Sequence, residues 1–378
     1  MLFNNAAVLL TAAACVAAGP LLDSSPGRPD VTFSPKQPFR SMPKSPARTW
    51  VCNVEASGDG KDDSQNIINA LNRCNYGGHV VFGKDKNYTI AKALDMTFLR
   101  HIDIDIRGRI TFTDDMDYWQ KHSFKYTFQN ESTFFKIGGE DVNIYGGGEL
   151  YGNGPTWWKV FAHDKDLWRP ILFGIDGLKG GVISDLRLTD SPNWVNVILN
   201  SQDVVYNNIT IENKSEDPKV PAKNTDGWDT YRSDNIVIQN SRINNGDDCV
   251  SFKPNSTNIL VQNLWCNGSH GISVGSLGQY VGNTDIVENI TVYNIDMNHA
   301  SDGARIKAFP GAVGNATDQG GGNGHVRNVT YENIHNNNNE WAIEITQCYA
   351  LKDADQKPGY GSRGASAKTT PHGATLGV

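Results

Sequence analysis

The chain has 378 residues, of which 38% are hydrophobic and 20% charged, and its formal net charge is −7. This length is enough to bury a large core, and the acidic balance argues against a nucleic-acid partner. The 38 glycines favour many short strands and turns over helices.

The N-terminus is an apolar run that extends to Ala18. Its small residues at Ala17, Ala18 and Gly19 suit signal-peptidase cleavage, and it is too short to span a bilayer comfortably, although a single membrane anchor is an alternative. We therefore predict a signal peptide over residues 1–18, secretion to the extracellular space and no membrane association. Residues 19–48 are rich in Pro, Ser and basic residues without apolar periodicity, which predicts a linker or pro-segment.

Secretion would place the cysteines in an oxidising compartment, where disulfides form. Cys52 and Cys74 bracket one N-terminal unit, and Cys249 and Cys266 lie 17 residues apart, so each pair is predicted to form a disulfide. Cys348 is left over once the signal is removed. Asn-x-Ser/Thr motifs predict glycosylation sites at Asn87, Asn130, Asn208, Asn213, Asn255, Asn267, Asn289, Asn315 and Asn328.

One helix is predicted near the N-terminus. Ile67, Ile68, Leu71 and Cys74 recur at helical spacing, directly after a turn rich in Gly and Asp. A solenoid has an open apolar end that must be covered, so the expected role of this helix is an end cap.

From about residue 79 a strand-like phrase recurs, with β-branched or aromatic residues alternating with polar ones between two asparagines. Its starting positions advance by 27, 23, 31 and 39 residues, which is about one coil of a wide solenoid. We predict an all-β chain that forms a single-stranded right-handed parallel β-helix over residues 49–350, in preference to a β-sandwich. Residues 351–378 have no such phrase and are predicted to be a disordered tail. The clearest phrases are Asn208–Asn213, Asn235–Asn240, Asn258–Asn263, Asn289–Asn294 and Asn328–Asn333.

Polar clusters inside the repeats contain a possible catalytic set. Asp226, Asp247 and His270 are separated by 21 and 23 residues, so one coil would bring them to the same face, with Asp248 beside Asp247. Hydrolysis of a glycosidic bond needs one carboxylic acid for the leaving oxygen and one carboxylate for water. Any one of these aspartates alone is more simply explained as a turn residue, but the stacked set favours catalysis.

Arg305 and Lys307 alternate around Ile306, so both should project from one face of a strand. A guanidinium and an ammonium side by side can bind a sugar carboxylate. Charged residues at a solvated strand edge are the simpler alternative.

These clusters resemble the signatures of the polygalacturonase family, glycoside hydrolase family 28, in their order along the chain: Asn224-Thr225-Asp226, Gly246-Asp247-Asp248, His270-Gly271 and Arg305-Ile306-Lys307. The resemblance implies a parallel β-helix and an inverting hydrolase of α-1,4-galacturonosyl links in pectin, with no metal or cofactor. It also implies that Asp247 is the general acid and that Asp226 and Asp248 activate water. His270 would support the acid, while Arg305 and Lys307 would bind the galacturonate carboxylate.

Residues around the motifs are most similar to exo-acting, monomer-releasing members, which adds Lys253, Asn224, Gln279 and Tyr280 to the predicted substrate-binding residues. The long intervals before Asn289 and Asn328 could supply loops that close one end of a groove. The alternatives are an endo-polygalacturonase, a xylogalacturonan or rhamnogalacturonan hydrolase, a calcium-dependent pectate lyase and a non-catalytic glycan-binding β-helix. We expect a monomer with a pectin substrate.

Overall fold

The computed structural model describes residues 27–310, 319–347, 349–350, 366–367 and 376–377. The predicted signal peptide, the glycosylation site at Asn315, Cys348 and most of the predicted tail lie outside the described residues. Within the described part of the chain, no helix is both long and apolar enough to cross a membrane.

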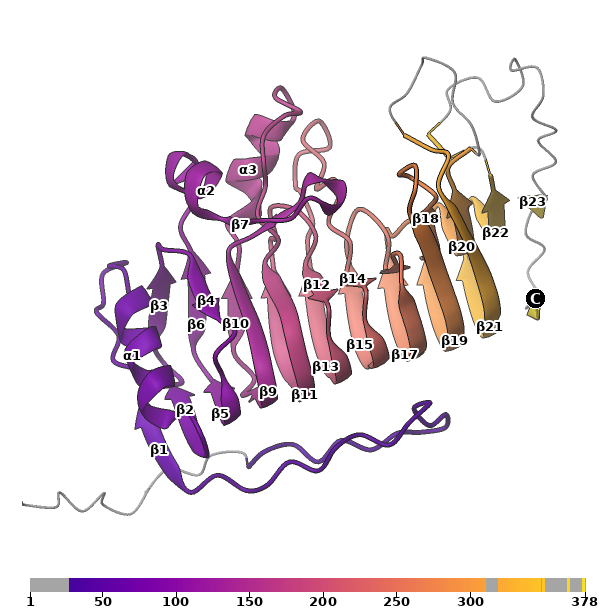
Figure 1. The fold of residues 1–378 in the computed structure, drawn as a ribbon. Coiled ribbons are helices and arrows are strands. Elements are labelled where there is room, and N and C mark those ends of the chain that lie inside the picture. The colour runs from indigo at the N-terminus through magenta and orange to yellow at the C-terminus, as the bar shows by residue number, and fades with distance from the viewer. Residues whose placement is uncertain (1–26, 311–318, 348, 351–365, 368–375, 378) are drawn as a thin grey trace, which may run out of the picture.

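The chain winds as a solenoid in which each turn adds a parallel strand beside the strand of the previous turn (Figure 1). The main ladder consists of β1 (Trp50–Asn53), β2 (Gly78–Phe82), β5 (Arg100–Ile106), β9 (Phe135–Tyr145), β11 (Phe173–Thr189), β13 (Gln202–Glu212), β15 (Asp234–Asn244), β17 (Ser256–Asn267), β19 (Thr284–Asn298) and β21 (Asn323–Asn337). This ladder is the continuous sheet along the bottom of Figure 1.

A second ladder of shorter strands forms another face and carries the functional residues. Besides the first residues of β9 and β11, it consists of β4 (Leu94–Met96), β12 (Asn196–Leu199), β14 (Trp228–Tyr231), β16 (Val250–Phe252), β18 (Ile272–Leu277), β20 (Asp302–Ala308) and β22 (Trp341–Thr346). A third, N-terminal ladder pairs β3 (Asn87–Ile90), β6 (Arg109–Phe112) and β10 (Glu149–Tyr151) with the end of β11. Short antiparallel pairings join β7 (Phe124–Lys125) to β8 (Ser132–Thr133), β23 (Ser366–Ala367) to β22, and β24 (Leu376–Gly377) to β21.

The interior is built from columns of identical or similar apolar residues. Val204 pairs with Ile236, Ile236 with Ile259, Ile259 with Ile290, and Ile290 with Val329, and all five side chains are buried. Burying each such side chain contributes about 1.5–3 kcal/mol. The repeated phrase therefore stacks in register along one core, which confirms the predicted parallel β-helix and excludes the sandwich.

Asparagine ladders hold the corners of the solenoid. Asn328 Nδ2 donates to Asn289 Oδ1 at 2.8 Å, and Asn289 Nδ2 donates to Asn258 Oδ1 at 2.9 Å. The φ angles of these residues are 50°, 56° and 55°, a left-handed region that Asn tolerates better than most residues. The asparagine that opens each sequence phrase is therefore a corner residue.

Helix α1 (Ser64–Cys74) covers the N-terminal end of the solenoid, as predicted. Its Ile67 and Leu71 side chains are buried in the main core cluster. The two predicted disulfides are also present, Cys52–Cys74 between β1 and α1, and Cys249–Cys266. The remaining helical segments, α2 (Met116–His122), η1 (Phe128–Asn130) and α3 (Gly154–Phe161), lie in loops.

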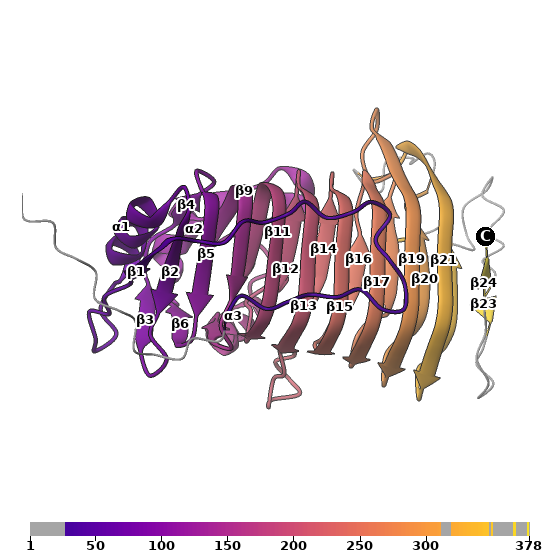
Figure 2. The same ribbon diagram turned by 90° about the horizontal axis from the view of Figure 1, so that it is seen from below.

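Residues 27–48, predicted as a linker or pro-segment, run out and back along the outer surface of the main sheet (Figure 2). Phe33 and Met42 pack against an outward-facing apolar cluster that contains Val205, Val237 and Leu260. We call residues 27–48 the strap. Its contacts come from isolated side chains rather than from a periodic pattern, so the sequence gives no signal for them.

We expect Arg48→Ala to lower the free energy of unfolding by about 1–3 kcal/mol, because it removes the charged hydrogen bonds of Arg48 to Asp103 and Asp141, while Arg28 still pairs with Asp103. Arg48 is 4% exposed, and its Nε lies 2.9 Å from Asp103 Oδ1. The matched control is Arg40→Ala, since the Arg40 side chain is 48% exposed and also pairs with an aspartate, and such exposed pairs contribute about 0–1 kcal/mol. Urea unfolding of both variants measures these changes in free energy. Equal small effects would show that the ion pairs of Arg48 do not stabilise the fold.

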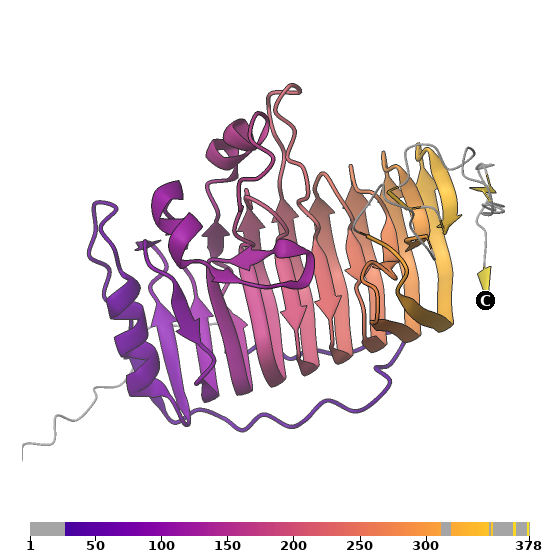
Figure 3. The same cartoon turned by 45° about the horizontal axis from the view of Figure 1, so that its top comes forward.

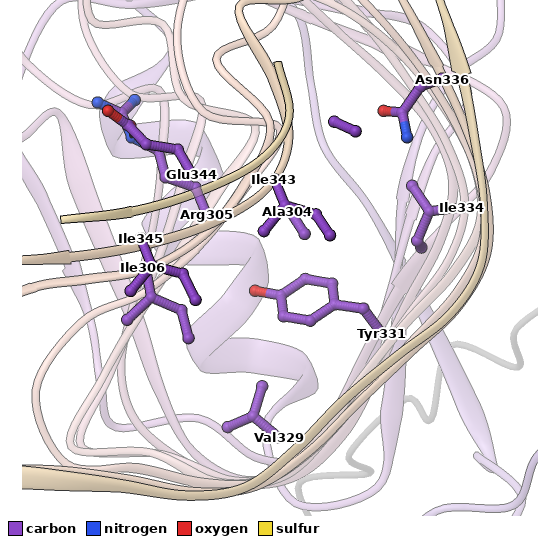
Figure 4. A pocket seen from close by; sticks show the side chains of 11 residues that line it. Ala304, Arg305, Ile306, Val329, Tyr331, Ile334, Asn336, Ile343, Glu344 and Ile345 are labelled. Atoms are coloured by element: carbon purple, nitrogen blue, oxygen red, sulfur yellow. The ribbon is translucent and has the colours of Figure 1, made fainter. Parts of the chain in front are cut away.

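Figure 4 shows the interior at the last turns, where Tyr331, Ile343 and Ile345 project into an apolar cavity. Arg305 and Glu344 lie together on the other side of the strands that carry them. The core therefore extends to β21 and β22.

The predicted glycosylation sites differ in accessibility. Asn87, Asn130, Asn208 and Asn328 are exposed, which suits attachment of a glycan. The Asn213 side chain, in contrast, is only 3% exposed. Its buried amide is less suited to carry a glycan than the exposed sites, and glycosylation at Asn213 stays a prediction.

Candidate active site

Three adjacent short strands bring the predicted catalytic residues together. β14 pairs in register with β16, and β16 with β18. Asp226, Asp248 and His270 each stand two residues before the first residue of one of these strands, and Asp247 precedes Asp248. The steps along the sequence thus correspond to single turns of the solenoid.

Asp247 lies at the centre of this group. Its Oδ1 is 3.1 Å from His270 Nδ1, and its Oδ2 accepts a hydrogen bond from Asn224 Nδ2 at 3.4 Å. One side-chain oxygen of Asp247, one of Asp248 and one ring nitrogen of His270 all lie within 4.8 Å of one another.

Two lysines neutralise the buried carboxylates around Asp247. Lys307 Nζ lies 2.6 Å from Asp248 Oδ2. Lys253 Nζ lies 3.1 Å from Asp229 Oδ1 and 3.9 Å from Asp226 Oδ2. Both lysine side chains are almost fully buried, so these pairs are poorly screened by water.

A cavity of about 540 Å³ opens onto these residues. It is large enough for sugar units, and residues from distant parts of the chain line it. The predicted residues that line it are Asn224, Asp226, Asp247, Lys253, Gln279, Tyr280 and Lys307.

The other predicted site residues are not among those that line this cavity. Asp248 is fully buried and paired with Lys307, and His270 contacts Asp247 from the side. Arg305 does not line the cavity: its Nε lies 2.8 Å from Glu344 Oε2, and its Nη1 lies 3.7 Å from Asp302 Oδ2.

Asp226 and Asp247, the two predicted catalytic carboxyls that line the cavity, have opposite pKa shifts. Burial raises the pKa of Asp226 well above its usual range, and the negative charges of Asp229 and Asp247 raise it further. Burial also raises the pKa of Asp247, but the hydrogen bond and charge of His270, together with the charge of Lys307, outweigh it and lower the pKa to about 2. The hydrogen bond to Asp247 in turn raises the pKa of His270. Burial, reinforced by neighbouring negative charge, therefore favours the protonated form of Asp226, whereas the contacts of the predicted acid Asp247 favour its ionised form.

Sequence reasoning missed three charged residues of the site. Asp229 is fully buried beside Lys253. Arg169 Nη2 donates to Asn224 Oδ1 at 2.8 Å and so orients the amide that contacts Asp247. Glu131 lines the cavity and accepts a hydrogen bond from the Asn193 amide. Arg169 precedes a proline shortly before β11, whereas Glu131 stands in a loop, and neither position belongs to a polar cluster that the repeat marks.

The group formed by Asp247, Asp248 and His270 is compact enough to hold a cation. However, Lys307 Nζ already lies 2.6 Å from Asp248, and the pKa of His270 is raised, which favours its charged form. A cationic imidazole cannot ligate a metal. The charges of the site are thus balanced by the protein's own cations, which does not favour the calcium-dependent lyase.

Because the pKa values of Glu131 and Asp229 are raised in the folded protein, we expect the protein to lose stability as pH rises. Burial raises the pKa of Glu131 from 4.5 to about 8, and burial raises that of Asp229 from 3.8 to about 7, even though Lys253 opposes this second shift. Because both folded-state values lie above the unfolded ones, the stability contribution is complete below about pH 4 and is lost as pH rises to about 8.

Thermal unfolding from pH 4 to 9 checks this prediction, with a melting temperature that falls over that range. Glu131→Gln should flatten the fall, because its amide cannot ionise, while Glu140→Gln on the exposed surface should leave it unchanged. The prediction is wrong if the Glu131 variant and the wild type have parallel profiles.

Comparison with known proteins agrees with this geometry. The family model described as "Glycosyl hydrolases family 28" matches residues 79–362. The chain belongs to glycosyl hydrolase family 28. It is therefore a glycosidase with the parallel β-helix of this family, as the sequence motifs predict.

Individual relatives within family 28 are close. "Probable exopolygalacturonase X" from Aspergillus fumigatus is 61% identical over 322 residues, which are 84% of this chain and 74% of the relative. "Exopolygalacturonase X-1" from Emericella nidulans is 60% identical over 322 residues, with the same shares of the two chains. Among solved structures, an endo-xylogalacturonan hydrolase from Aspergillus tubingensis is 34% identical, with a TM-score of 0.73 over 80% of this chain and 78% of that chain.

Proposed function

We propose that this family 28 enzyme is an extracellular exo-acting galacturonidase that hydrolyses α-1,4-galacturonosyl links at the end of polygalacturonate chains and releases galacturonic acid. The relatives named exopolygalacturonase at about 60% identity support this reading. The apolar N-terminal run supports secretion.

One observation carries the chemical part of the proposal: Asp226 and Asp247 line the same cavity, and their surroundings shift their pKa values in opposite directions. An inverting hydrolase needs one carboxyl that holds a proton and one that is ionised. The shifts of Asp226 and Asp247 in opposite directions supply such a pair.

By the family motifs, Asp247 protonates the leaving oxygen, while Asp226 and Asp248 position and deprotonate water. The proton must then move to Asp247 when substrate binds. The charge of Lys307 is one of the factors that lower the pKa of Asp247, and a galacturonate carboxylate bound at Lys307 would cancel it. The added negative charge would raise the pKa of Asp247, and the coupled carboxyls would redistribute their proton.

Substrate recognition is assigned to cations on the cavity wall. Lys307 and Lys253 line the cavity, and a substrate with one carboxylate per sugar suits them. Arg305 is held by Glu344 at 2.8 Å, so we propose that it acts on the substrate carboxylate only after leaving this partner, or supports Lys307 from behind.

Incubation of the purified full chain with unbranched oligogalacturonide tests the proposal. We expect galacturonic acid as the only early product, at a rate that a chelator does not change. A ladder of oligomers would indicate endo action, and an unsaturated, ultraviolet-absorbing product would indicate a lyase. An Asp247→Asn preparation purified in parallel excludes a contaminating enzyme.

A second candidate is hydrolysis of xylose-decorated galacturonan. The solved endo-xylogalacturonan hydrolase at a TM-score of 0.73 favours it. Its 34% identity is well below that of the relatives named exopolygalacturonase, so we rank this function second.

A further inference from the structure

A hairpin that neither the motifs nor the proposed chemistry uses crosses the catalytic face. It consists of β7, η1 and β8, and lies between α2 and β9. Figure 3 shows it in magenta, lying across the front of the neighbouring strands. We call residues 124–133 the crossing hairpin.

The tip of the crossing hairpin is attached at two separate places. The Phe128 ring stacks on the Tyr231 ring, with centroids 4.0 Å apart and an angle of 18° between the planes. The Gln129 backbone N–H donates to Tyr280 Oη at 3.1 Å, and Gln129 Nε2 donates to Gln279 Oε1 at 3.1 Å. The first contact is on β14, and the second is on the loop after β18, so the tip spans the intervening turn that carries β16.

The crossing hairpin also separates two hollows. The catalytic cavity of about 540 Å³ is lined by Asp226 and Asp247 from the strand side and by residues 127 and 129–131 from the hairpin side. A smaller hollow of about 160 Å³ is lined by residues 126–128 of the hairpin and by Tyr231. Glu131 lines both. The hairpin thus stands where an open groove would continue.

The backbone at the tip is held in an unusual conformation. Gln129 has φ 52° and ψ 17° inside η1, and Asn130 has φ 55°. Left-handed angles at residues other than Gly raise the energy of the chain and persist where surrounding contacts impose them. The contacts made by Phe128 and Gln129 supply that constraint.

We propose that the crossing hairpin is the wall that restricts this enzyme to chain ends, with the Phe128 and Gln129 contacts as its latches. A polymer can be cut internally only if it passes through the groove on both sides of the catalytic carboxylates. A bridge fixed at Tyr231, Gln279 and Tyr280 blocks one side, so that only a terminal residue enters. The inference rests on the proposed exo-galacturonidase function and names the residues that determine its specificity.

Loosening the latches should change the products rather than only the rate. Gln129→Ala removes the side-chain hydrogen bond, and Phe128→Ala removes the ring stack. Since one net hydrogen bond changes an equilibrium by about three- to tenfold, and the stack is worth a similar amount, we expect the double variant to raise the share of oligomeric products by about tenfold or more.

The readout is the fall in viscosity of polygalacturonate per reducing end released, together with the chain length of early products. This ratio does not depend on the amount of active enzyme, so a merely damaged protein would not change it. Gln65→Ala is the matched control, because its Nε2 donates to Asn69 Oδ1 at 2.9 Å on a distant helix. Tyr118→Phe is a second control that removes a hydroxyl acceptor outside the cavity.

The outcomes separate the two levels of the proposal. If the wild type releases no galacturonic acid, the proposed function itself fails. Suppose instead that the wild type releases monomer, and that the Gln129→Ala and Phe128→Ala variants are active but also release only monomer. The proposal that the crossing hairpin restricts the enzyme to chain ends is then overturned. Loss of activity in a folded Gln129→Ala protein, with no oligomers, also overturns it and places Gln129 in substrate binding. If Phe128→Ala fails to fold, the Gln129→Ala variant alone tests the proposal, because the Gln129 side chain is only half-buried.

Discussion

Replacing Asp247 by asparagine should lower the rate of polygalacturonate hydrolysis by about 10²–10⁴, the usual contribution of a positioned acid–base group. The amide cannot protonate the leaving oxygen, and its single oxygen can keep only one of the two contacts that Asp247 makes with His270 and Asn224. The measurement is kcat and KM on oligogalacturonide, with circular dichroism to confirm that the variant is folded.

Asp296→Asn is the matched control for this variant. Asp296 Oδ1 lies 3.1 Å from His335 Nδ1, the same separation as in the Asp247–His270 pair, but on the exposed surface. We expect no change in activity for the control. Near-full activity of the Asp247 variant would show that the acid is a different residue.

Replacing Asp226 by asparagine should reduce activity by a similar factor while making the fold more stable at neutral and higher pH. Its raised pKa means that the folded protein favours the protonated, neutral form, which the amide imitates. The wild type must ionise a buried carboxyl as pH rises, and the variant need not. Activity falls because an amide cannot accept the proton of the attacking water.

An aryl galacturonide with an acidic phenol leaving group then separates the roles of Asp226 and Asp247. Such a leaving group needs no protonation, so the acid variant should recover much of its rate, and the base variant should not. Recovery in the Asp247 variant supports the assignment from the motifs. Recovery in the Asp226 variant instead would reverse the two roles, in the direction that the pKa shifts of Asp226 and Asp247 indicate.

The fold was predictable because its information is local and repeated. Each phrase bounded by asparagines, such as Asn258–Asn263, alternates inward-facing and outward-facing residues with period two, and one coil separates successive phrases. Stacking then follows, since only parallel pairing buries all the apolar positions at once. The same spacing placed Asp226, Asp247 and His270 on adjacent turns.

Other parts of the structure depend on contacts that no local pattern encodes. The strap meets the sheet through single side chains such as Phe33 and Met42, whose partners lie far away in the sequence. The raised pKa of Glu131 arises from its burial where the crossing hairpin meets the cavity wall, and the latch at Gln129 joins residues 150 positions apart. The identity of the protonated carboxyl was also beyond sequence reasoning, because it depends on whether His270 contacts Asp247 or Asp226.

The most direct test of the central claim is the anomeric form of the first galacturonic acid released, followed by proton nuclear magnetic resonance before mutarotation. Paired carboxylates that act on the bond and on a water molecule from opposite faces give inversion. The account therefore predicts the β-anomer from the α-linked substrate. Initial release of the α-anomer would contradict it, because retention requires a covalent intermediate on one of the aspartates.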